Sequence, residues 1–263
     1  MKNVQNITKA VIPAAGLGKR FWPMTKIMPK ELLPIVTRPS LHLILEEAQD
    51  AGLKEIILVL SADKEPMMAH LREFFPQMTF HFVEQKEPLG LGHAVGLATK
   101  KVGDETFVVL LPDTLIDHTT SATKQLLAIF KKNGQSVNAA EQVSAEEVQH
   151  FGAYEVASSE GRLHLAKRVV EKPKPGEQPS NLVVSGRYIF TPEIFSILHN
   201  TKPGRNNEIQ LADAMNTLAG EEKLLAYEFE GIHFDIGNPV GFIQANIHYG
   251  VKEYGERIHQ RFK

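Results

Sequence analysis

The sequence predicts an α/β fold whose sheet is largely parallel and covered by helices on both faces. Short apolar runs alternate with segments of helical periodicity through the first half of the chain. Apolar runs without polar alternation are typical of strands buried on both faces, and strand–helix alternation at this spacing indicates βαβ units. The expected strands are 10–15, 55–60, 79–83 and 106–111, and the expected helices are 40–51 and 93–99.

The second half of the chain has more turns and favours antiparallel pairing. Here the expected strands are 153–156, 163–170 and 182–190, and the expected helices are 192–198, 209–218 and 242–254. The only rigid polar connection, 172–176 (KPKPG), is too short to separate domains. We therefore expect a single domain over 1–263, with a first half of about 7–120, a second half of about 121–240 and a C-terminal helical region over 241–263.

Composition excludes several classes of protein. The 263 residues include 29 Lys and Arg against 31 Asp and Glu, so the chain lacks the positive field of many nucleic-acid-binding proteins. Cysteine is absent, which excludes disulfides, thiolate catalysis and cysteine-ligated metals. The start does not resemble a signal peptide, and no apolar run approaches the roughly 18 residues of a spanning helix. We expect a cytoplasmic protein with neither nucleic acid nor membrane as a partner.

A glycine loop follows the first expected strand, at 16–20 (GLGKR). Glycines allow backbone N–H groups to approach phosphate oxygens, and Arg20 and Lys30 can neutralise a polyphosphate. The loop does not match a P-loop, since Pro13 stands at the first glycine position and Arg20 at the Ser/Thr position. It does not match a dinucleotide fingerprint either, because residues 21–23 (FWP), with Trp22 and Pro23, supply neither the third glycine nor the start of a helix. Alone, it fits a structural turn equally well.

The loop, together with 29–34 (PKELLP), resembles the signature of the sugar-nucleotide pyrophosphorylases. Residues 85–94 (QKEPLGLGHA) look very like the base-recognition segment of the bacterial UTP–glucose-1-phosphate uridylyltransferases within that family. Further matches follow in the family's order at 171–173 (EKP), 179–182 (PSNL), 186–188 (GRY), 208–211 (EIQL) and 234–237 (FDIG).

The resemblance implies a Rossmann-like three-layer αβα sandwich with a mixed, mostly parallel sheet and a smaller sugar-binding lobe. The first half of the chain would bind the nucleotide and the second half the sugar. It also implies Mg²⁺-dependent in-line transfer of a uridylyl group from UTP to glucose 1-phosphate, without a covalent intermediate. Expected nucleotide-binding residues are Ala14, Ala15, Gly16, Gly18, Lys19, Arg20, Lys30, Gln85 and Gly90. Expected sugar-phosphate-binding residues are Gly152, Glu171, Lys172 and Glu208; expected metal ligands are Asp113 and Asp235; expected catalytic residues are Arg20, Lys30, Asp113 and Lys172.

The assigned residue types suit that chemistry. Gln85 can read the polar edge of uracil, because its amide both donates and accepts. Asp113 directly follows an expected strand, where open α/β sheets place ligands. Two carboxylates, with phosphates and water, are a common ligand set for Mg²⁺. Taken singly, Asp113 favours a cap of the next turn over a metal ligand, and Glu171 with Lys172 fits a solvated ion pair of little energetic value.

The sequence departs from the family at three places and leaves alternatives open. Lys19 replaces a Thr, Thr114 replaces an Asp, and the stretch 70–82 is short where relatives carry a helical excursion. Phe151 replaces a Tyr in the sugar half. The family is commonly dimeric or tetrameric, so a homo-oligomer is expected. The open alternatives are transfer from dTTP, CTP or GTP to a sugar 1-phosphate, and a catalytically weak regulatory protein that binds nucleotide sugars.

Overall fold

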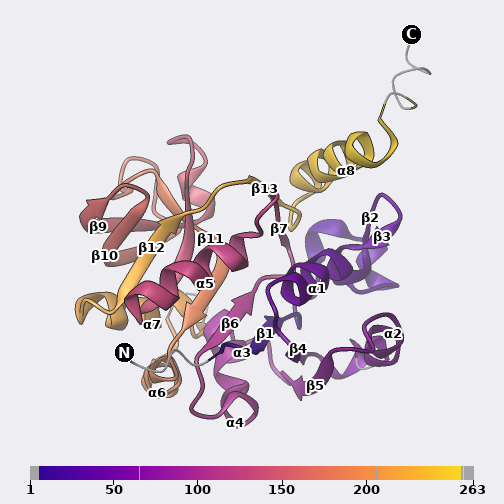
Figure 1. Cartoon of the computed structure of the whole chain (residues 1–263), viewed down its shortest axis with the longest axis horizontal. Helices are drawn as coiled ribbons and strands as arrows, with labels where there is room; N and C mark the ends of the chain where they lie inside the picture. Colours follow the sequence, from indigo (N-terminus) through magenta and orange to yellow (C-terminus); the bar gives the residue numbers. More distant parts are fainter. Residues whose placement is uncertain (1–5, 65, 205–206, 256, 258–263) are drawn as a thin grey trace.

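A nine-stranded mixed sheet runs through the centre of the molecule (Figure 1). The computed structural model describes residues 6–64, 66–204, 207–255 and 257. Along the sheet the strand order is β5-β4-β1-β6-β11-β8-β12-β10-β9. These strands are β1 (Lys9–Pro13), β4 (Glu55–Leu60), β5 (Thr79–Glu84), β6 (Phe107–Leu110), β8 (Ser136–Gln142), β9 (Gly152–Glu160), β10 (Leu163–Glu171), β11 (Leu182–Phe190) and β12 (Leu224–Glu228).

The first four strands of the sheet order are parallel, and β8 and β12 also pair in parallel. β11 joins the two parts by pairing antiparallel with β6 and β8, while β10 pairs antiparallel with β12 and β9. Two short ladders lie outside this sheet: β2 (Pro34–Ile35) with β3 (Arg38–Pro39), and β7 (Thr114–Asp117) with β13 (Ile232–Asp235). The predicted α/β fold with a mixed sheet is confirmed.

Helices cover both faces of the sheet, as the apolar strands predict (Figure 1). The α-helices are α1 (Ser40–Asp50), α2 (Met67–Phe74), α3 (Leu91–Leu97), α4 (Thr99–Val102), α5 (Ala122–Asn133), α6 (Glu193–Asn200), α7 (Leu211–Gly220) and α8 (Pro239–Tyr254). Short 3-10 helices occupy η1 (Lys19–Phe21), η2 (Met24–Lys26), η3 (Lys30–Leu32), η4 (Ala62–Lys64) and η5 (Val148–His150). The expected helices 40–51, 93–99, 192–198, 209–218 and 242–254 overlap α1, α3, α6, α7 and α8.

Alternate side chains of each strand enter opposite cores. In β1, Ala10 and Ile12 join the apolar cluster under α1, α2, α5 and α8, whereas Val11 joins the cluster under α3, α6 and α7. The period of two along a strand produces this division. It explains why β1 and β4 have no polar side chains between their apolar ones, since both faces are buried.

Several elements of the structure are absent from the sequence-based assignment, namely the strands β2, β3, β7, β8, β12 and β13 and the α-helices α2, α4 and α5. The segment 70–82, expected to be short, contains most of α2 and the beginning of β5. The ladder of β7 and β13 matters most for function, because it pairs Thr114, which follows Asp113, with Asp235 from a distant part of the chain. In the described part of the chain, no helix has the length and apolar character required to cross a membrane.

Candidate active site

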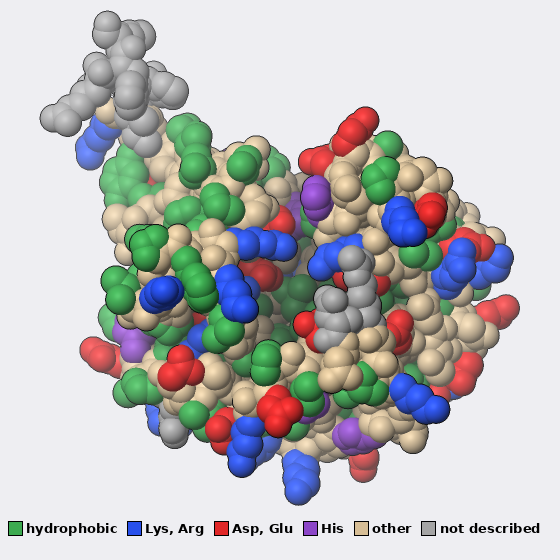
Figure 2. Space-filling view, turned by 180° about the vertical axis from the view of Figure 1, so that it is seen from behind, with side chains coloured by type: hydrophobic (Ala, Val, Ile, Leu, Met, Phe, Trp, Pro, Cys, Tyr) green, Lys and Arg blue, Asp and Glu red, His purple; other side chains and the backbone are tan. Residues whose placement is uncertain are grey.

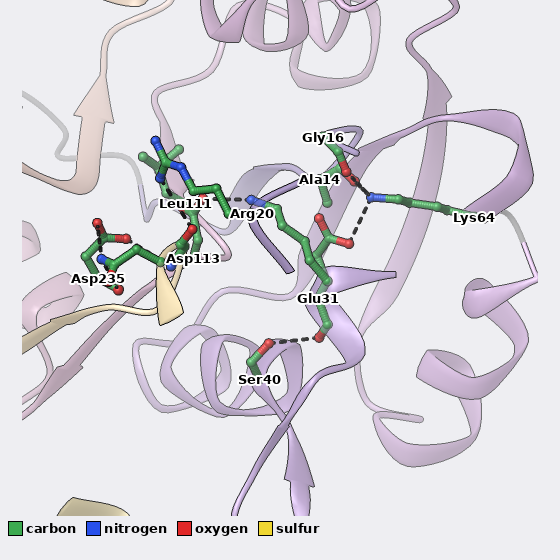
Figure 3. A network of polar contacts seen from close by, with 12 residues as sticks. Ala14, Gly16, Arg20, Glu31, Ser40, Lys64, Leu111, Asp113 and Asp235 are labelled. Carbon is green, nitrogen blue, oxygen red and sulfur yellow. Dashed lines mark hydrogen bonds and ion pairs between the residues drawn. The ribbon is translucent and has the colours of Figure 1, made fainter. Parts of the chain in front are cut away.

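The glycine loop after β1 is held by a buried lysine from η4. The Lys64 ammonium lies 2.7 Å from the carbonyl oxygen of Ala14, 2.8 Å from that of Gly16 and 2.9 Å from the Glu31 carboxylate (Figure 3). The side chains of Lys64 and Glu31 are only 5% and 0% exposed. Burial raises the pKa of Glu31, although the cations of Lys64 and Lys30 oppose that shift. This pair therefore fixes the backbone of the loop from beneath.

Lys30 reaches from η3 to the carboxylate of Asp113 across the loop. The Lys30 ammonium lies 2.7 Å from Asp113 Oδ2 (Figure 3). Burial disfavours the charged form of Lys30, but the carboxylates of Asp113, Glu31 and Asp235 outweigh it and raise the pKa of this lysine. Burial likewise opposes ionisation of Asp113, but the cations of Lys30 and Arg20 lower the pKa of this carboxyl. Both groups are therefore charged at neutral pH.

Asp113 and Asp235 are brought together by the ladder of β7 and β13. Asp235 pairs with Thr114 in that ladder, and the Ile236 N–H donates to the Asp113 carbonyl oxygen at 2.9 Å. A Cβ added at Gly237 would lie 3.0 Å from Asp235 Oδ1 and 3.1 Å from Asp113 Oδ2. Both carboxylates therefore face one small space beside Gly237, and Figure 3 shows them next to each other.

A buried arginine supports the turn that carries Asp113. Arg187 is fully buried, and its guanidinium pairs with Glu47 at 2.8 Å. It also donates to the carbonyl oxygens of Leu111 at 3.2 Å and Thr114 at 2.8 Å. Burial opposes ionisation of Glu47, but Arg187 lowers the pKa of this carboxyl. Arg187 thus clamps the backbone on both sides of Asp113.

Two cavities meet at Asp113. One has a volume of about 350 Å³ and is lined by the glycine loop, Lys30, Gln85 and Gly90. The other has a volume of about 330 Å³ and is lined by Gly152, Glu171, Lys172 and Asp235, among others. Four residues line both: Leu91, Leu111, Asp113 and Glu208. Figure 2 shows a hollow between two lobes of the molecule, with acidic and basic side chains around it.

In the first cavity, Gln85 lies near the start of α3. Its amide nitrogen lies 3.2 Å from the Gly90 carbonyl oxygen and 2.9 Å from His93 Nδ1. Gly90 adopts a positive φ of 100°, and a Cβ there would lie 2.7 Å from the Ile209 carbonyl oxygen. This close approach requires glycine at position 90. Gln85 and Gly90 thus form one wall, which the sequence predicted as a base-reading segment.

In the second cavity, the predicted sugar-phosphate residues come from three elements. Gly152 begins β9 and pairs with Glu171 at the end of β10. Lys172 follows with a φ of 45°, and its ammonium lies 3.6 Å from the Glu171 carboxylate. Glu208, on the loop before α7, accepts a hydrogen bond from the Gln210 side chain at 2.9 Å. These charged side chains face Asp113 from the opposite lobe.

Not every predicted site residue lines a cavity. Ala14 is buried, and Gly18 supports the turn with a φ of 62°. Lys19 and Arg20 are exposed in η1, although the Arg20 guanidinium donates to the Gly237 carbonyl oxygen at 3.3 Å. Sequence reasoning did not single out Lys64, because no local pattern distinguishes it from a surface lysine.

Comparison with known proteins identifies the family. Residues 9–251 match the model of the nucleotidyl transferase family. The UTP–glucose-1-phosphate uridylyltransferase of Bacillus subtilis is 39% identical, with 95% of this chain and 93% of that protein aligned. That of Staphylococcus haemolyticus is 40% identical, with 95% of this chain and 94% of that protein aligned.

Solved structures show the same relationship. A UDP-glucose pyrophosphorylase in complex with UDP-glucose superposes with a TM-score of 0.87 at 39% identity, covering 94% of this chain and 99% of that one. A UTP-bound enzyme of this kind from Acinetobacter baumannii superposes with a TM-score of 0.84 at 33% identity, covering 97% and 98%. The likeness extends over nearly the whole of both chains. This chain is therefore an enzyme of the nucleotidyl transferase family.

Proposed function

We propose that this chain transfers a uridylyl group from UTP to glucose 1-phosphate, yielding UDP-glucose and pyrophosphate. The observation that carries the proposal is the meeting of two cavities at Asp113, one with Lys30 on its wall and the other with Lys172. Such an arrangement can hold a triphosphate and a sugar phosphate with their reacting groups adjacent. The likeness to UTP–glucose-1-phosphate uridylyltransferases supports the choice of substrates.

The proposed reaction is a direct in-line displacement. A phosphate oxygen of glucose 1-phosphate attacks the α-phosphorus of UTP, the bond from that phosphorus to the β-phosphate oxygen breaks, and pyrophosphate leaves. The attacking oxygen is already anionic, so no general base is required. Positioning of the two phosphates and stabilisation of charge then determine the rate.

The two carboxylates beside Gly237 fit a magnesium ion. Asp113 and Asp235 would supply two oxygen ligands, and no group of three or more potential ligands occurs in the described ranges. Mg²⁺ commonly binds in this way, through one or two carboxylates together with substrate phosphates and water. When bound, the ion would neutralise charge on the phosphates. The low pKa of Asp113 keeps its carboxylate ionised for this role.

The first half of the chain would hold the nucleotide. Backbone groups around Gly16 and the cations of Arg20 and Lys30 would contact the triphosphate, with Lys19 nearby, and Gln85 would read the uracil. The loop fixed by Lys64 would give the triphosphate a preformed site. We propose this division of labour for residues of about 7–120.

The second half, about 121–240, would hold the sugar phosphate. Lys172 would bind the phosphate, while Glu171 and Glu208 would accept hydrogen bonds from sugar hydroxyls. Glycine at position 152 allows Glu171 to lie close to the backbone, because an added Cβ there would lie 3.1 Å from the Val169 side chain and 3.3 Å from the Glu171 carboxylate. In this arrangement Lys172 and Lys30 approach the reacting phosphates from opposite sides.

Gly90→Ala is expected to lower kcat/KM for UTP about tenfold or more. The added methyl group would collide with the Ile209 carbonyl oxygen and would be strained at a φ of 100°. Gly103→Ala is the matched control, because Gly103 also has a positive φ but nothing lies within 4 Å of an added Cβ. Steady-state kinetics on both variants check this. Equal kcat/KM for UTP in Gly90→Ala and the wild type would contradict the role of the close contact.

The proposed function is tested by measuring pyrophosphate release with Mg²⁺ from UTP, dTTP, CTP, GTP and ATP, each paired with glucose 1-phosphate and with other sugar phosphates. Release is expected with UTP and glucose 1-phosphate. Release with another nucleotide would retain the mechanism and overturn the base assignment. No release with any pair, from folded protein, would favour the regulatory alternative.

Because UTP is an intracellular nucleotide, we place this reaction in the cytoplasm, without nucleic acid or membrane as partner.

We further propose that the chain forms a homo-oligomer through α8. Exposed apolar side chains follow one another at helical spacing along it: Val240, Ile243, Ile247, Val251 and Tyr254. Figure 1 shows α8 at the edge of the molecule, where a second copy can pack its own α8 against this face. Ile243→Glu with Ile247→Glu is expected to yield monomers by light scattering, whereas Lys132→Glu, at an exposed position of α5, leaves the assembly intact. An unchanged mass in the double variant would contradict this interface.

A further inference from the structure

The second cavity contains a histidine whose outer ring nitrogen has no protein partner. His233, in β13, lines this cavity, and its side chain is 9% exposed. Its Nδ1 is hydrogen-bonded to Glu141 Oε1. Its Nε2 is buried and has no hydrogen-bond partner in the part of the chain that the structure describes. Buried polar atoms are normally paired, so the free nitrogen indicates a missing ligand atom.

The ring of His233 is held in place by its neighbours. Ser185 Oγ donates to the same Glu141 oxygen at 2.9 Å, and the Phe151 ring meets the imidazole edge-on at 6.3 Å between centroids. Ser185 is also buried and lines the cavity. The Glu141 carboxylate accepts the Nδ1 hydrogen, so Nε2 is the ring nitrogen left for a ligand. A ligand hydroxyl, which can both donate and accept, can hydrogen-bond to Nε2.

The position of His233 matches that of a sugar ring. His233 precedes Asp235 by two residues in β13, so both side chains lie on the same face of the strand, about 6.6 Å apart along it. Asp235 lies beside Asp113, where the reacting phosphates are proposed to bind. His233 thus lines the same cavity as Asp235, at a distance from the proposed phosphate site that is comparable to the size of a hexose.

We propose that His233 determines sugar specificity, with Nε2 hydrogen-bonded to one ring hydroxyl of the sugar 1-phosphate. Glu141 and Ser185 are positioning residues, because they set the orientation of the imidazole. This inference rests on the proposed function and adds to it a specific contact with the sugar. A sugar that lacks the recognised hydroxyl would leave Nε2 unpaired in the complex, and the enzyme would discriminate against it.

The test is turnover of glucose 1-phosphate and its four monodeoxy analogues by the wild type and His233→Phe. In the wild type, analogues that lack a hydroxyl bound by Glu171 or Glu208 are expected to lose turnover. So is the one analogue that lacks the hydroxyl bound by His233, whose kcat/KM is expected about 10- to 100-fold below that of glucose 1-phosphate. In His233→Phe, glucose 1-phosphate is expected to lose a similar factor, and the penalty for that one analogue is expected to disappear. The KM for UTP is expected to stay within about twofold, since the nucleotide cavity is untouched.

Further variants separate recognition from structure. His233→Gln, which keeps a polar atom near the place of Nε2, is expected to recover part of the discrimination. Glu141→Gln is expected to weaken discrimination at the same ring position without changing the KM for UTP. His81→Phe is the matched control: His81 lies on β5, also pairs with a glutamate, at 3.5 Å from Glu55, and lines neither cavity.

The outcomes distinguish a failure of the proposed function from a failure of the proposed role of His233. If wild-type protein turns over no sugar phosphate, the proposed function fails and this inference fails with it. If wild type turns over glucose 1-phosphate but discriminates against no deoxy analogue, the inference alone is overturned. The same holds if His233→Phe or His233→Gln retains the full wild-type penalty. Thermal melting of each variant shows whether a loss of turnover reflects unfolding.

Discussion

Asp113→Asn is expected to reduce kcat by about a hundred- to a thousandfold or more, the range found when one preorganised electrostatic contact to a transition state is removed. The substitution removes the negative charge that we propose binds Mg²⁺, and it removes the carboxylate partner of Lys30 at 2.7 Å. The proposed uracil contact of Gln85 is untouched, so the KM for UTP is expected to change less than kcat. The measurement is steady-state pyrophosphate release as a function of Mg²⁺ concentration.

Asp117→Asn is the matched control for this experiment. Asp117 lies at the other end of β7, pairs with Lys252 at 2.6 Å, and lines neither cavity. Its variant is expected to keep kcat within about threefold of the wild type, since Asp117 lies outside the proposed substrate sites and its partner Lys252 is exposed. Asp113→Asn with near wild-type, Mg²⁺-dependent turnover would exclude Asp113 as a metal ligand.

Lys64→Met is expected to lower the free energy of unfolding by about 3–5 kcal/mol, because it leaves the Glu31 carboxylate buried without a partner. The loss is expected to be smallest at low pH, where Glu31 is protonated in both the folded and the unfolded protein. Burial raises the pKa of Glu31 in the folded state. The free energy of unfolding of the variant therefore falls as pH rises above the ordinary pKa of a glutamate. Chemical denaturation over a pH series measures this.

Two controls isolate the buried pair. Lys64→Met combined with Glu31→Leu removes both charges and is expected to be more stable than Lys64→Met alone. Lys167→Met breaks an exposed pair, with Glu155 at 2.6 Å, and is expected to cost no more than about 1 kcal/mol. Because Lys64 also holds the carbonyl groups of Ala14 and Gly16, its loss is expected to raise the KM for UTP as well. A Lys64→Met protein as stable as the Lys167→Met protein would contradict this account.

The first half of the fold was predictable because its strands are buried on both faces. Apolar runs such as 55–60, followed by turns and helical periodicity, match β4 and its neighbours residue for residue or nearly so. The second half was harder to predict. β8 (SVNAAEQ) contains residues with low β-propensity and is stabilised by its burial between β11 and β12. The missed helix α5 did have signals, a Ser121 cap and Gly134 at its end.

Sequence alone also indicated many residues that the structure brings together around the two cavities. The glycine loop, Asp113 and Asp235 lie at the ends of strands or ladders, where local sequence shows that a strand is ending. The supporting contacts were not predictable, because they join residues far apart in the chain. Arg187 and Glu47, or Lys64 and Glu31, meet only through the packing of the sheet and its helices. In His233, Nδ1 pairs with Glu141 of β8, and Nε2 has no partner among the described residues. This arrangement depends on the packing of β13 against β8, which the local sequence does not show.

The central claim is most directly tested by identifying the products formed from UTP and glucose 1-phosphate. Purified protein is incubated with both substrates, with Mg²⁺ or with a chelator, and the products are separated and quantified by mass spectrometry. The account predicts UDP-glucose and pyrophosphate in equal amounts with Mg²⁺, and neither product with the chelator. Folded protein that forms no UDP-glucose with Mg²⁺, or forms it equally well with the chelator, would contradict the account.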